Sequence, residues 1–330
     1  MIAGLGVLAA LAGVVFQYLA NRKATRLYPP PGRLVDVGGR LLHARVLGSG
    51  APTVVFESGI SASSINWTAL QDRIAAVTTT IAYDRAGLGW SSSASGALDA
   101  NLLLEDLSGL LRQLHAPAPF ILVGHSYGAL LTRLYAEQHP EQVAGMVLVD
   151  PVLACDWANP NPRLKRMLQV ACLMSSWGGF LARLGVVRMA TAPLMRGSTV
   201  MPKLIGKASA GPAAEVIDRL AGEVRKLPPE SWPVIRAHWS RPSNFRALVM
   251  HLRALPSSFA GLRNSQTNIP LVVISAADLS PDGLVEHRSI AARSTRGEHL
   301  VAARGGHWVQ LDDAELVADA ILRVIEAVRQ

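Results

Sequence analysis

The sequence predicts an α/β protein in which helices cover both faces of a mostly parallel β-sheet. Short apolar runs of strand length alternate with segments of helical periodicity on both sides of residues 152–262. One such run, Phe120–Val123, leads through a glycine-flanked serine directly into a segment with helical spacing. Half of the 330 residues are hydrophobic, so the chain can bury the sizeable core that such a sheet requires.

The predicted sheet begins with an antiparallel hairpin, Arg33–Val37 and Leu41–Val46, joined by two glycines. Apolar runs predict six further strands: Thr53–Glu57, Thr79–Tyr83, Phe120–Val123, Ala144–Val149, Ile269–Ser275 and His299–Ala303. Helical spacing predicts helices over Trp67–Ala76, from the Asp99 cap to Leu114, from Ala129 to the His139-Pro140 stop, and over Leu284–Arg293 and Asp313–Val328.

Between Val152 and about Leu262 the alternation stops, and short helices punctuated by proline and glycine replace it. We therefore expect a helical insertion over this interval. No acidic residue occurs between Asp156 and Glu215, and this interval holds basic residues mixed with methionine, tryptophan and phenylalanine. The basic residues are Arg163, Lys165, Arg166, Arg183, Arg188, Arg196, Lys203 and Lys207. The mixture favours contact with a membrane surface, the alternative being an ordinary cap with solvated arginines.

Residues 2–20 contain no charged side chain and only one strongly polar one, Gln17. As a helix they would be about 28 Å long, close to the thickness of a bilayer core. Arg22, Lys23 and Arg26 follow, as expected of an anchor that places the following domain on the cytoplasmic side. We thus expect an anchor helix over 1–27 and the main domain over 28–330. The alternative is a secretory signal peptide and a secreted or periplasmic protein.

Other features of composition argue against several classes of protein. The net charge is +8, but no nucleic-acid-binding motif accompanies it, so we expect no nucleic-acid partner. Cys155 and Cys172 form neither a metal-binding spacing nor a disulfide framework, and we expect no metal and no cofactor. The oligomeric state does not follow from the sequence.

The glycine-flanked serine is the central motif. In Gly124-His125-Ser126-Tyr127-Gly128, a strand precedes the serine and a helix follows it. Glycines at these two positions permit a sharp turn, in which a side chain would collide with the neighbouring strand or helix. The segment resembles the nucleophile elbow of the α/β-hydrolase family, and the resemblance extends over residues 33–330. It implies the α/β-hydrolase fold, with a lid inserted after the sixth strand.

In that family the order of catalytic residues is serine, acid, histidine, and the last two follow late strands. Ser126, Asp278 and His307 meet this order, so the resemblance implies Ser126 as nucleophile, His307 as general base and Asp278 as the acid. Asp282 and Asp150 are alternatives for the acid.

The resemblance also implies an oxyanion hole. Glu57-Ser58-Gly59 ends a predicted strand where the family usually has His-Gly, and the backbone N–H of Ile60 should donate to the oxyanion. Tyr127, directly after the nucleophile, should supply the second N–H. The loop Asp84-Arg85 is similar to one that braces this region in the family.

The predicted function is hydrolysis of a small apolar ester by a serine esterase or lipase, through an acyl-enzyme. Carbon–carbon bond or thioester hydrolysis and perhydrolysis use the same triad and remain alternatives. A member of the fold that only binds a ligand is a further one. Serine at the elbow argues against epoxide hydrolases and dehalogenases, which use aspartate there.

Overall fold

The computed structural model describes residues 2–93, 96, 98–194 and 224–330. The chain divides into two compact units. A helical unit comprises Met1–Pro29 and Leu173–Arg246, and a sheet unit comprises Pro30–Cys172 and Ala247–Gln330. The predictions made for Arg196, Lys203 and Lys207 lie outside the described residues.

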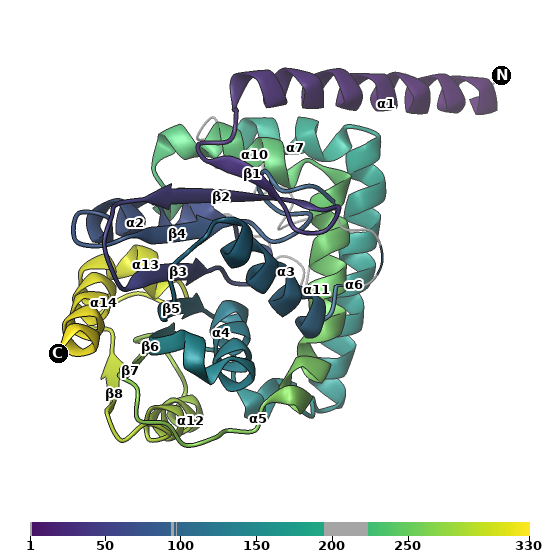
Figure 1. The fold of residues 1–330 in the computed structure, drawn as a ribbon. Helices are drawn as coiled ribbons and strands as arrows, with labels where there is room; N and C mark the ends of the chain where they lie inside the picture. Colours follow the sequence, from purple (N-terminus) through teal and green to yellow (C-terminus); the bar gives the residue numbers. More distant parts are fainter. Residues whose placement is uncertain (1, 94–95, 97, 195–223) are drawn as a thin grey trace. The chain divides into compact units, whose positions relative to one another are not determined.

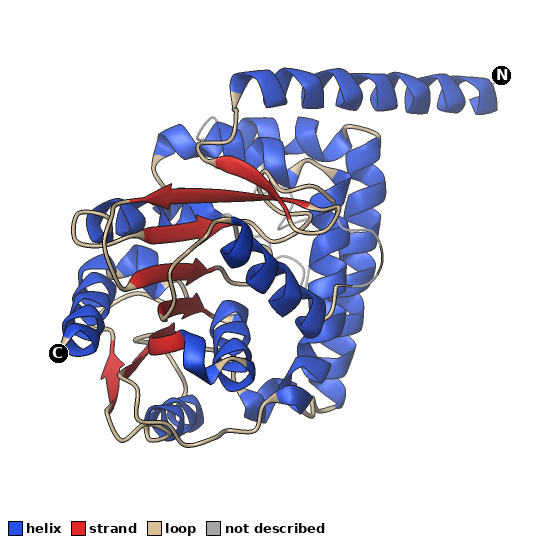
Figure 2. Cartoon of the chain, in the orientation of Figure 1, coloured by secondary structure: helices blue, strands red, loops and turns tan. Residues whose placement is uncertain are grey.

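The sheet unit contains an eight-stranded sheet in the order β1-β2-β4-β3-β5-β6-β7-β8 (Figures 1 and 2). The strands are β1 Arg33–Asp36, β2 Leu41–Leu47, β3 Thr53–Glu57, β4 Thr80–Tyr83, β5 Phe120–His125, β6 Val143–Val149, β7 Leu271–Ser275 and β8 Gly297–Val301. β2 pairs antiparallel with β1 and β4, and the remaining pairs are parallel. The mostly parallel sheet confirms the predicted fold class.

Helices cover both faces of this sheet because successive strand residues point to opposite sides. Val55 and Leu122 face a core that includes residues of α3 (Ala100–Gln113), α4 (Tyr127–Gln138) and α12 (Pro281–Ala291). Val54 and Val123 face a second core with residues of α2 (Thr68–Ile74), α13 (Val309–Asp312) and α14 (Ala314–Arg329). The central strands are buried on both faces, which explains their continuous apolar sequences.

Helices occupy the described part of the predicted lid interval. They are α5 Ala154–Trp157, α6 Pro162–Arg183, α7 Val186–Leu194, α10 Trp232–Trp239 and α11 Pro242–Ser258. At the other end of the chain, α1 runs from Ile2 to Leu27. Within the described residues, its part Gly4–Leu27 is long and apolar enough to cross a membrane or to be a signal sequence.

A fully buried carboxylate, Asp84, connects three segments beside the sheet. Its two oxygens accept hydrogen bonds from the backbone N–H groups of Ser64 (2.7 Å) and Trp90 (3.0 Å), and one also contacts Nδ1 of His43 (2.9 Å). Burial by itself would raise the pKa of Asp84, but the hydrogen bond from His43 and those two N–H groups hold it below its ordinary value. The ionised carboxylate of Asp84 therefore stabilises the fold. Its hydrogen bonds also hold the loop Asp84–Trp90 in a fixed position next to β4.

We predict that Asp84→Asn lowers the free energy of unfolding in urea at pH 7 by about 2–4 kcal/mol, because charge-assisted hydrogen bonds are lost in a buried site. A carboxyl whose pKa is lowered by folding stabilises the protein above its unfolded pKa of about 3.9, and less as pH falls through its folded pKa. The difference between wild type and variant should therefore shrink in acid.

Asp72→Asn is the matched control, since Asp72 is exposed and, among the described residues, pairs only with Arg45 at the surface (2.7 Å). Its effect should stay within about 1 kcal/mol. Equal losses for the two variants, or a loss for Asp84→Asn that does not change with pH, would contradict the role of Asp84.

Candidate active site

Ser126 lies at the turn between β5 and α4, in a strained backbone conformation (φ 55°, ψ −118°). Glycine is required at both flanking positions because neighbouring backbone atoms lie where a Cβ atom would be. A Cβ atom on Gly124 would lie 2.6 Å from the Cα of Ala129, and one on Gly128 would lie 2.4 Å from the carbonyl oxygen of Glu57. No L-residue with a side chain fits at either position without moving the backbone. The sequence therefore dictates a tight turn with the Ser126 hydroxyl at the carboxyl end of the central strands.

The loop after β8 brings His307 to this hydroxyl. The Nε2 atom of His307 lies 2.8 Å from Oγ of Ser126, and its Nδ1 atom lies 2.6 Å from Oδ2 of Asp150. The imidazole thus connects a hydroxyl on one side with a carboxylate on the other. The side chain of Asp150 is 6% exposed and that of His307 is 27% exposed, so the carboxylate is shielded while the imidazole remains accessible.

Asp150 follows β6 directly, and its backbone N–H donates to the carbonyl of Ile274 (2.7 Å). Its second carboxylate oxygen, Oδ1, accepts a hydrogen bond from the N–H of Ala276 (2.9 Å). Burial alone would raise the pKa of Asp150, but the hydrogen bond and charge of His307, with the N–H of Ala276, keep it below its ordinary value. The carboxylate is therefore ionised at neutral pH and held in one orientation.

The prediction for the acid needs a correction, because the structure places Asp150 and not Asp278 against His307. β6 is the immediate neighbour of β5 in the sheet, so its end lies beside the elbow, whereas β7 is one strand further away. Asp278 lies in an exposed turn beyond β7, near Gly306, and Asp282 lies exposed in the first turn of α12. The order serine, acid, histidine along the chain is the same for all three candidates.

His125 makes a contact that was not predicted from the sequence. Its Nε2 atom lies 2.8 Å from the backbone carbonyl oxygen of His307, and the two rings are 4.7 Å apart. His125 also contacts the ring of Trp308 at 5.3 Å. A histidine inside the elbow thus helps to fix the loop that presents His307, and its position next to Ser126 was the signal that could have indicated this.

The predicted oxyanion donors belong to two segments that adjoin Ser126. A Cβ on Gly59 would lie 3.4 Å from that of Ser126, so the segment before Ile60 runs beside Ser126. Tyr127 is the first residue of α4. Among the described residues, the N–H groups of Ile60 and Tyr127 donate to no protein acceptor. Two unpaired N–H groups next to a nucleophile are what a developing oxyanion requires.

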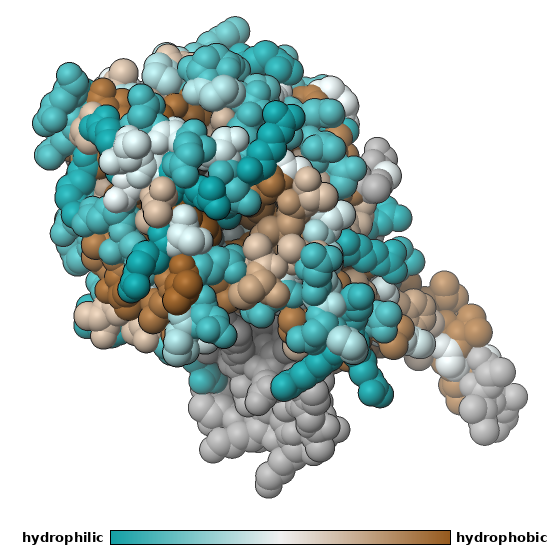
Figure 3. All heavy atoms as spheres, turned by 90° about the horizontal axis from the view of Figure 1, so that it is seen from below, coloured by the Kyte–Doolittle hydropathy of each residue, from teal (hydrophilic) through white to brown (hydrophobic). Residues whose placement is uncertain are grey.

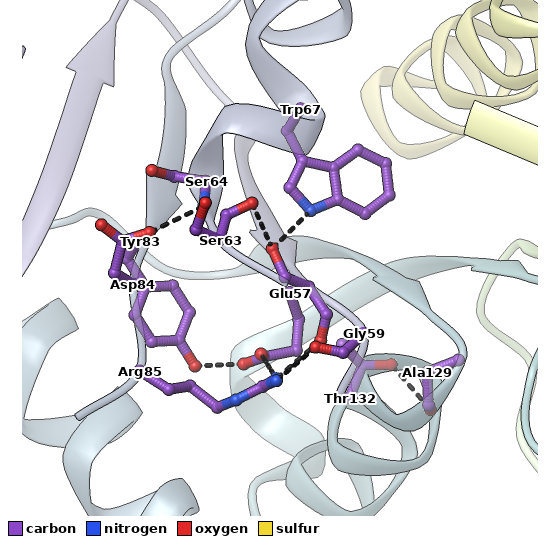
Figure 4. Close-up of polar contacts among 11 residues, drawn as sticks. Glu57, Gly59, Ser63, Ser64, Trp67, Tyr83, Asp84, Arg85, Ala129 and Thr132 are labelled. Atoms are coloured by element: carbon purple, nitrogen blue, oxygen red, sulfur yellow. Dashed lines mark hydrogen bonds and ion pairs between the residues drawn. The ribbon is translucent and has the colours of Figure 1, made fainter. Parts of the chain in front are cut away.

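A buried guanidinium supports this loop from behind (Figure 4). Arg85 donates to the carbonyl oxygens of Ser58 (2.6 Å) and Gly59 (2.5 Å) and forms an ion pair with Glu57, which also accepts from Tyr83. Burial raises the pKa of Glu57, opposed by the charge of Arg85 and by the Tyr83 hydrogen bond. Because Arg85 binds both carbonyls, the peptide that carries the Ile60 N–H has a fixed orientation.

Ser58 stands where the hydrolase family usually has histidine. Its hydroxyl accepts a hydrogen bond from Nε1 of Trp67 (3.1 Å) and donates to the carbonyl of Ser63 (3.1 Å). We call the segment 57–60 the oxyanion loop, after its predicted role. The contacts of Ser58 tie the start of this loop to the short 3₁₀ helix Ser64–Trp67 that follows it (Figure 4). Among the described residues, no group of three or more histidine, cysteine or acidic side chains has the geometry of a metal site.

Comparison with known proteins places the chain in a family. Residues 54–320 match the model of the alpha/beta hydrolase family, and the chain belongs to that family. It is 28% identical over 272 residues to a putative carbamate hydrolase of Klebsiella pneumoniae, covering 81% of this chain and 88% of that protein. It is 38% identical over 118 residues to 2-(acetamidomethylene)succinate hydrolase of Mesorhizobium japonicum, covering 36% of this chain.

That second match covers 42% of the Mesorhizobium protein. The chain likewise spans less than half the length of two uncharacterised proteins of Bacillus subtilis that it matches. Among solved structures, an esterase of Thermogutta terrifontis is similar in fold, with a TM-score of 0.62 and 18% identity over 90% of this chain and 97% of that one. The chain is therefore an α/β-hydrolase.

We predict that Arg85→Met slows the labelling of Ser126 by a fluorophosphonate on the order of tenfold or more, because the Ile60 N–H is no longer held in place. Labelling followed by mass spectrometry measures this without any knowledge of the substrate. Arg45→Met is the matched control, since Arg45 is also hydrogen-bonded, to Gln71 and Asp72, but does not contact the oxyanion loop. The same rate for both variants would contradict a role of Arg85 in orienting the loop.

Proposed function

We propose that this α/β-hydrolase is a serine hydrolase that cleaves a small apolar carboxylic ester through a Ser126–His307–Asp150 triad. The observation that supports it most is the pair of contacts at His307, 2.8 Å to Ser126 and 2.6 Å to Asp150. A serine hydroxyl is a weak nucleophile unless a base removes its proton, and a carboxylate that holds the base stabilises the imidazolium. These three residues are connected in the order that such proton transfer requires.

In the proposed mechanism, Oγ of Ser126 attacks the ester carbonyl while Nε2 of His307 takes the hydroxyl proton. The N–H groups of Ile60 and Tyr127 stabilise the negative charge on the tetrahedral intermediate. His307 then protonates the departing alcohol, which leaves an acyl group on Ser126. Water, activated by the same imidazole, hydrolyses the acyl-enzyme and restores the free hydroxyl. Asp150 stays ionised throughout, in agreement with its lowered pKa.

Hydrolysis of an acylated nitrogen is the second candidate. Two relatives are named for a carbamate and for 2-(acetamidomethylene)succinate, and the triad would attack either kind of carbonyl in the same way. The difference lies in the leaving group, because an amine must be protonated by His307 before it can leave. Thioester and carbon–carbon bond hydrolysis and perhydrolysis remain chemically open to the same residues.

A purely ligand-binding role has less support. A binding protein does not need an imidazole between a strained serine and a shielded carboxylate, nor two unpaired N–H groups beside that serine. Unchanged ester hydrolysis by Ser126→Ala would remove the proposed function altogether.

We predict that Asp150→Asn lowers kcat for p-nitrophenyl esters on the order of 10⁴-fold, because an amide favours the wrong tautomer of His307. Asp278→Asn is the matched control, the same substitution at an exposed residue near the same loop, and should change kcat by less than about threefold. A larger loss for Asp278→Asn than for Asp150→Asn would reverse the assignment of the acid.

A second prediction concerns the acyl group, since both kinds of substrate compared release the same alcohol, p-nitrophenol. We expect p-nitrophenyl esters to be hydrolysed with a higher kcat/KM than N-alkyl p-nitrophenyl carbamates of the same length, since a carbamate carbonyl is less electrophilic. Steady-state release of p-nitrophenol measures both. A preference for the carbamates would favour the second candidate over the ester hydrolase.

A further inference from the structure

The α1 helix is packed into the helical unit along its second half. A Cβ on Gly13 would lie 2.4 Å from the backbone oxygen of Leu184, and one on Gly185 would lie 2.6 Å from the ring of Phe16. Leu184 and Gly185 form the corner at which the axis turns by 93° between α6 and α7. On α1, Gln17 and Ala24 are buried, two turns apart on one face of the helix.

Four residues fasten α1 to the rest of the unit, and we call them the clamp: Gln17, Asn21, Arg188 and Ser240. Arg188 donates to Oε1 of Gln17 (3.1 Å) and to Oδ1 of Asn21 (2.6 Å), and Nε2 of Gln17 donates to the carbonyl of Ser240 (2.8 Å). Gln17 is 3% exposed and Arg188 is 7% exposed. Removing α1 would leave a buried guanidinium without these acceptors, which is costly.

The opposite face of α1 is apolar and uncovered. Leu8 (65%), Leu11 (57%) and Val15 (55%) are exposed, and hydrophobic residues are visible along the N-terminal part of α1 in Figure 3. The one strongly polar residue of the segment, Gln17, thus faces protein while leucine and valine face outward. In water the reverse distribution is expected, whereas in hydrocarbon a polar group must be satisfied internally.

The corner between α6 and α7 is apolar on its outside too. Trp177 (60%), Phe180 (50%) and Met189 (54%) are exposed. All three lie within eight residues of Gly185, or about 12 Å along a helix, and Gly185 itself contacts α1. Exposed aromatic and methionine side chains of this size on two adjoining elements mark an interaction surface.

The distribution of charge distinguishes between two possible partners of this surface, a second copy of the chain and a lipid bilayer. Exposed Arg22, Lys23 and Arg26 follow the apolar part of α1, and Arg183 precedes the corner. The described residues 157–194, which include the corner, contain no acidic side chain. A second copy would bring like charges together, whereas anionic phospholipid attracts each basic side chain by about 1 kcal/mol.

We propose that the helical unit docks on an anionic lipid bilayer, with the apolar face of α1 and the α6–α7 corner inserted together and the clamp holding them as one body. The α1 helix is then a permanent part of the folded unit and not a cleaved signal. This proposal concerns membrane attachment and does not depend on the chemistry of Ser126.

The test uses the full chain with Cys155→Ser and Cys172→Ser and a single new cysteine that carries an environment-sensitive fluorophore. Trp177→Cys places the label at the corner, and Val285→Cys, on an exposed residue (64%) of α12, is the matched control. The protein is reconstituted with phosphatidylcholine vesicles with or without phosphatidylglycerol, and spin-labelled lipid is the quencher. We expect strong quenching at position 177 with the anionic lipid, weaker quenching without it, and none at position 285.

The clamp is tested by adding Gln17→Leu and Asn21→Leu, which make α1 more apolar but leave Arg188 without its two acceptors. We expect α1 to stay in the membrane pellet while the label at position 177 loses its quenching. Thr25→Val is the control, because the exposed Thr25 hydroxyl donates to the Asn21 carbonyl of its own helix (3.1 Å) and lies outside the clamp. The same measurements in Ser126→Ala should be unchanged, which separates this proposal from the hydrolase function.

Four results would overturn all or part of the proposal. The first is a fluorophore at position 177 that remains in water while the protein sediments with the membrane. In that case α1 would attach the protein to the membrane without insertion of the corner. Another is quenching that survives the loss of the clamp. The third is an intact mass showing that residues before Asn21 are removed when the protein matures. Equal quenching with neutral and anionic lipid would overturn the role of the basic residues.

Discussion

The strained turn at Ser126 is the constraint on which the site depends. A backbone with φ near 55° in a residue other than glycine costs on the order of 1–3 kcal/mol, and it persists only where the surroundings hold it. Here the N–H of Ser126 donates to the carbonyl of Val149 (3.0 Å), and the Ser126 carbonyl accepts from Ala129 (3.0 Å). Gly124 and Gly128 allow the strand and helix to approach closely enough for these bonds to form.

The remaining groups reach Ser126 through the topology of the sheet. In a parallel sheet the carboxyl ends of neighbouring strands lie at one edge, so the loops after β3, β6 and β8 converge on the elbow. The loop after β3 contains Ile60, the loop after β6 carries the carboxylate of Asp150, and the loop after β8 carries the imidazole of His307. Buried groups fix each loop from behind: Arg85 for the first, the Ala276 N–H for the second and His125 for the third.

The sequence indicated the fold well, because the strands are buried on both faces and their apolar runs are continuous. The Gly-x-Ser-x-Gly turn is a local sequence pattern, and His307 follows a late strand in the chain order that the family implies. Both could therefore be predicted from the sequence. The position of Asp278 after a strand satisfied the same order as Asp150, and only strand adjacency distinguishes them. Within the clamp, the hydrogen bond between Gln17 and Arg188 joins residues 171 apart in the chain, and no local sequence pattern predicts such a contact.

The proposed function requires that Ser126 become covalently acylated during turnover. Rapid mixing with a p-nitrophenyl ester, an acid quench and peptide mass spectrometry measure this directly. We expect a burst of p-nitrophenol of about one equivalent per protein and an acyl mass on the peptide that contains Ser126, both absent in Ser126→Ala. Ester hydrolysis at full rate, with no burst and no acyl group on that peptide, would contradict the account.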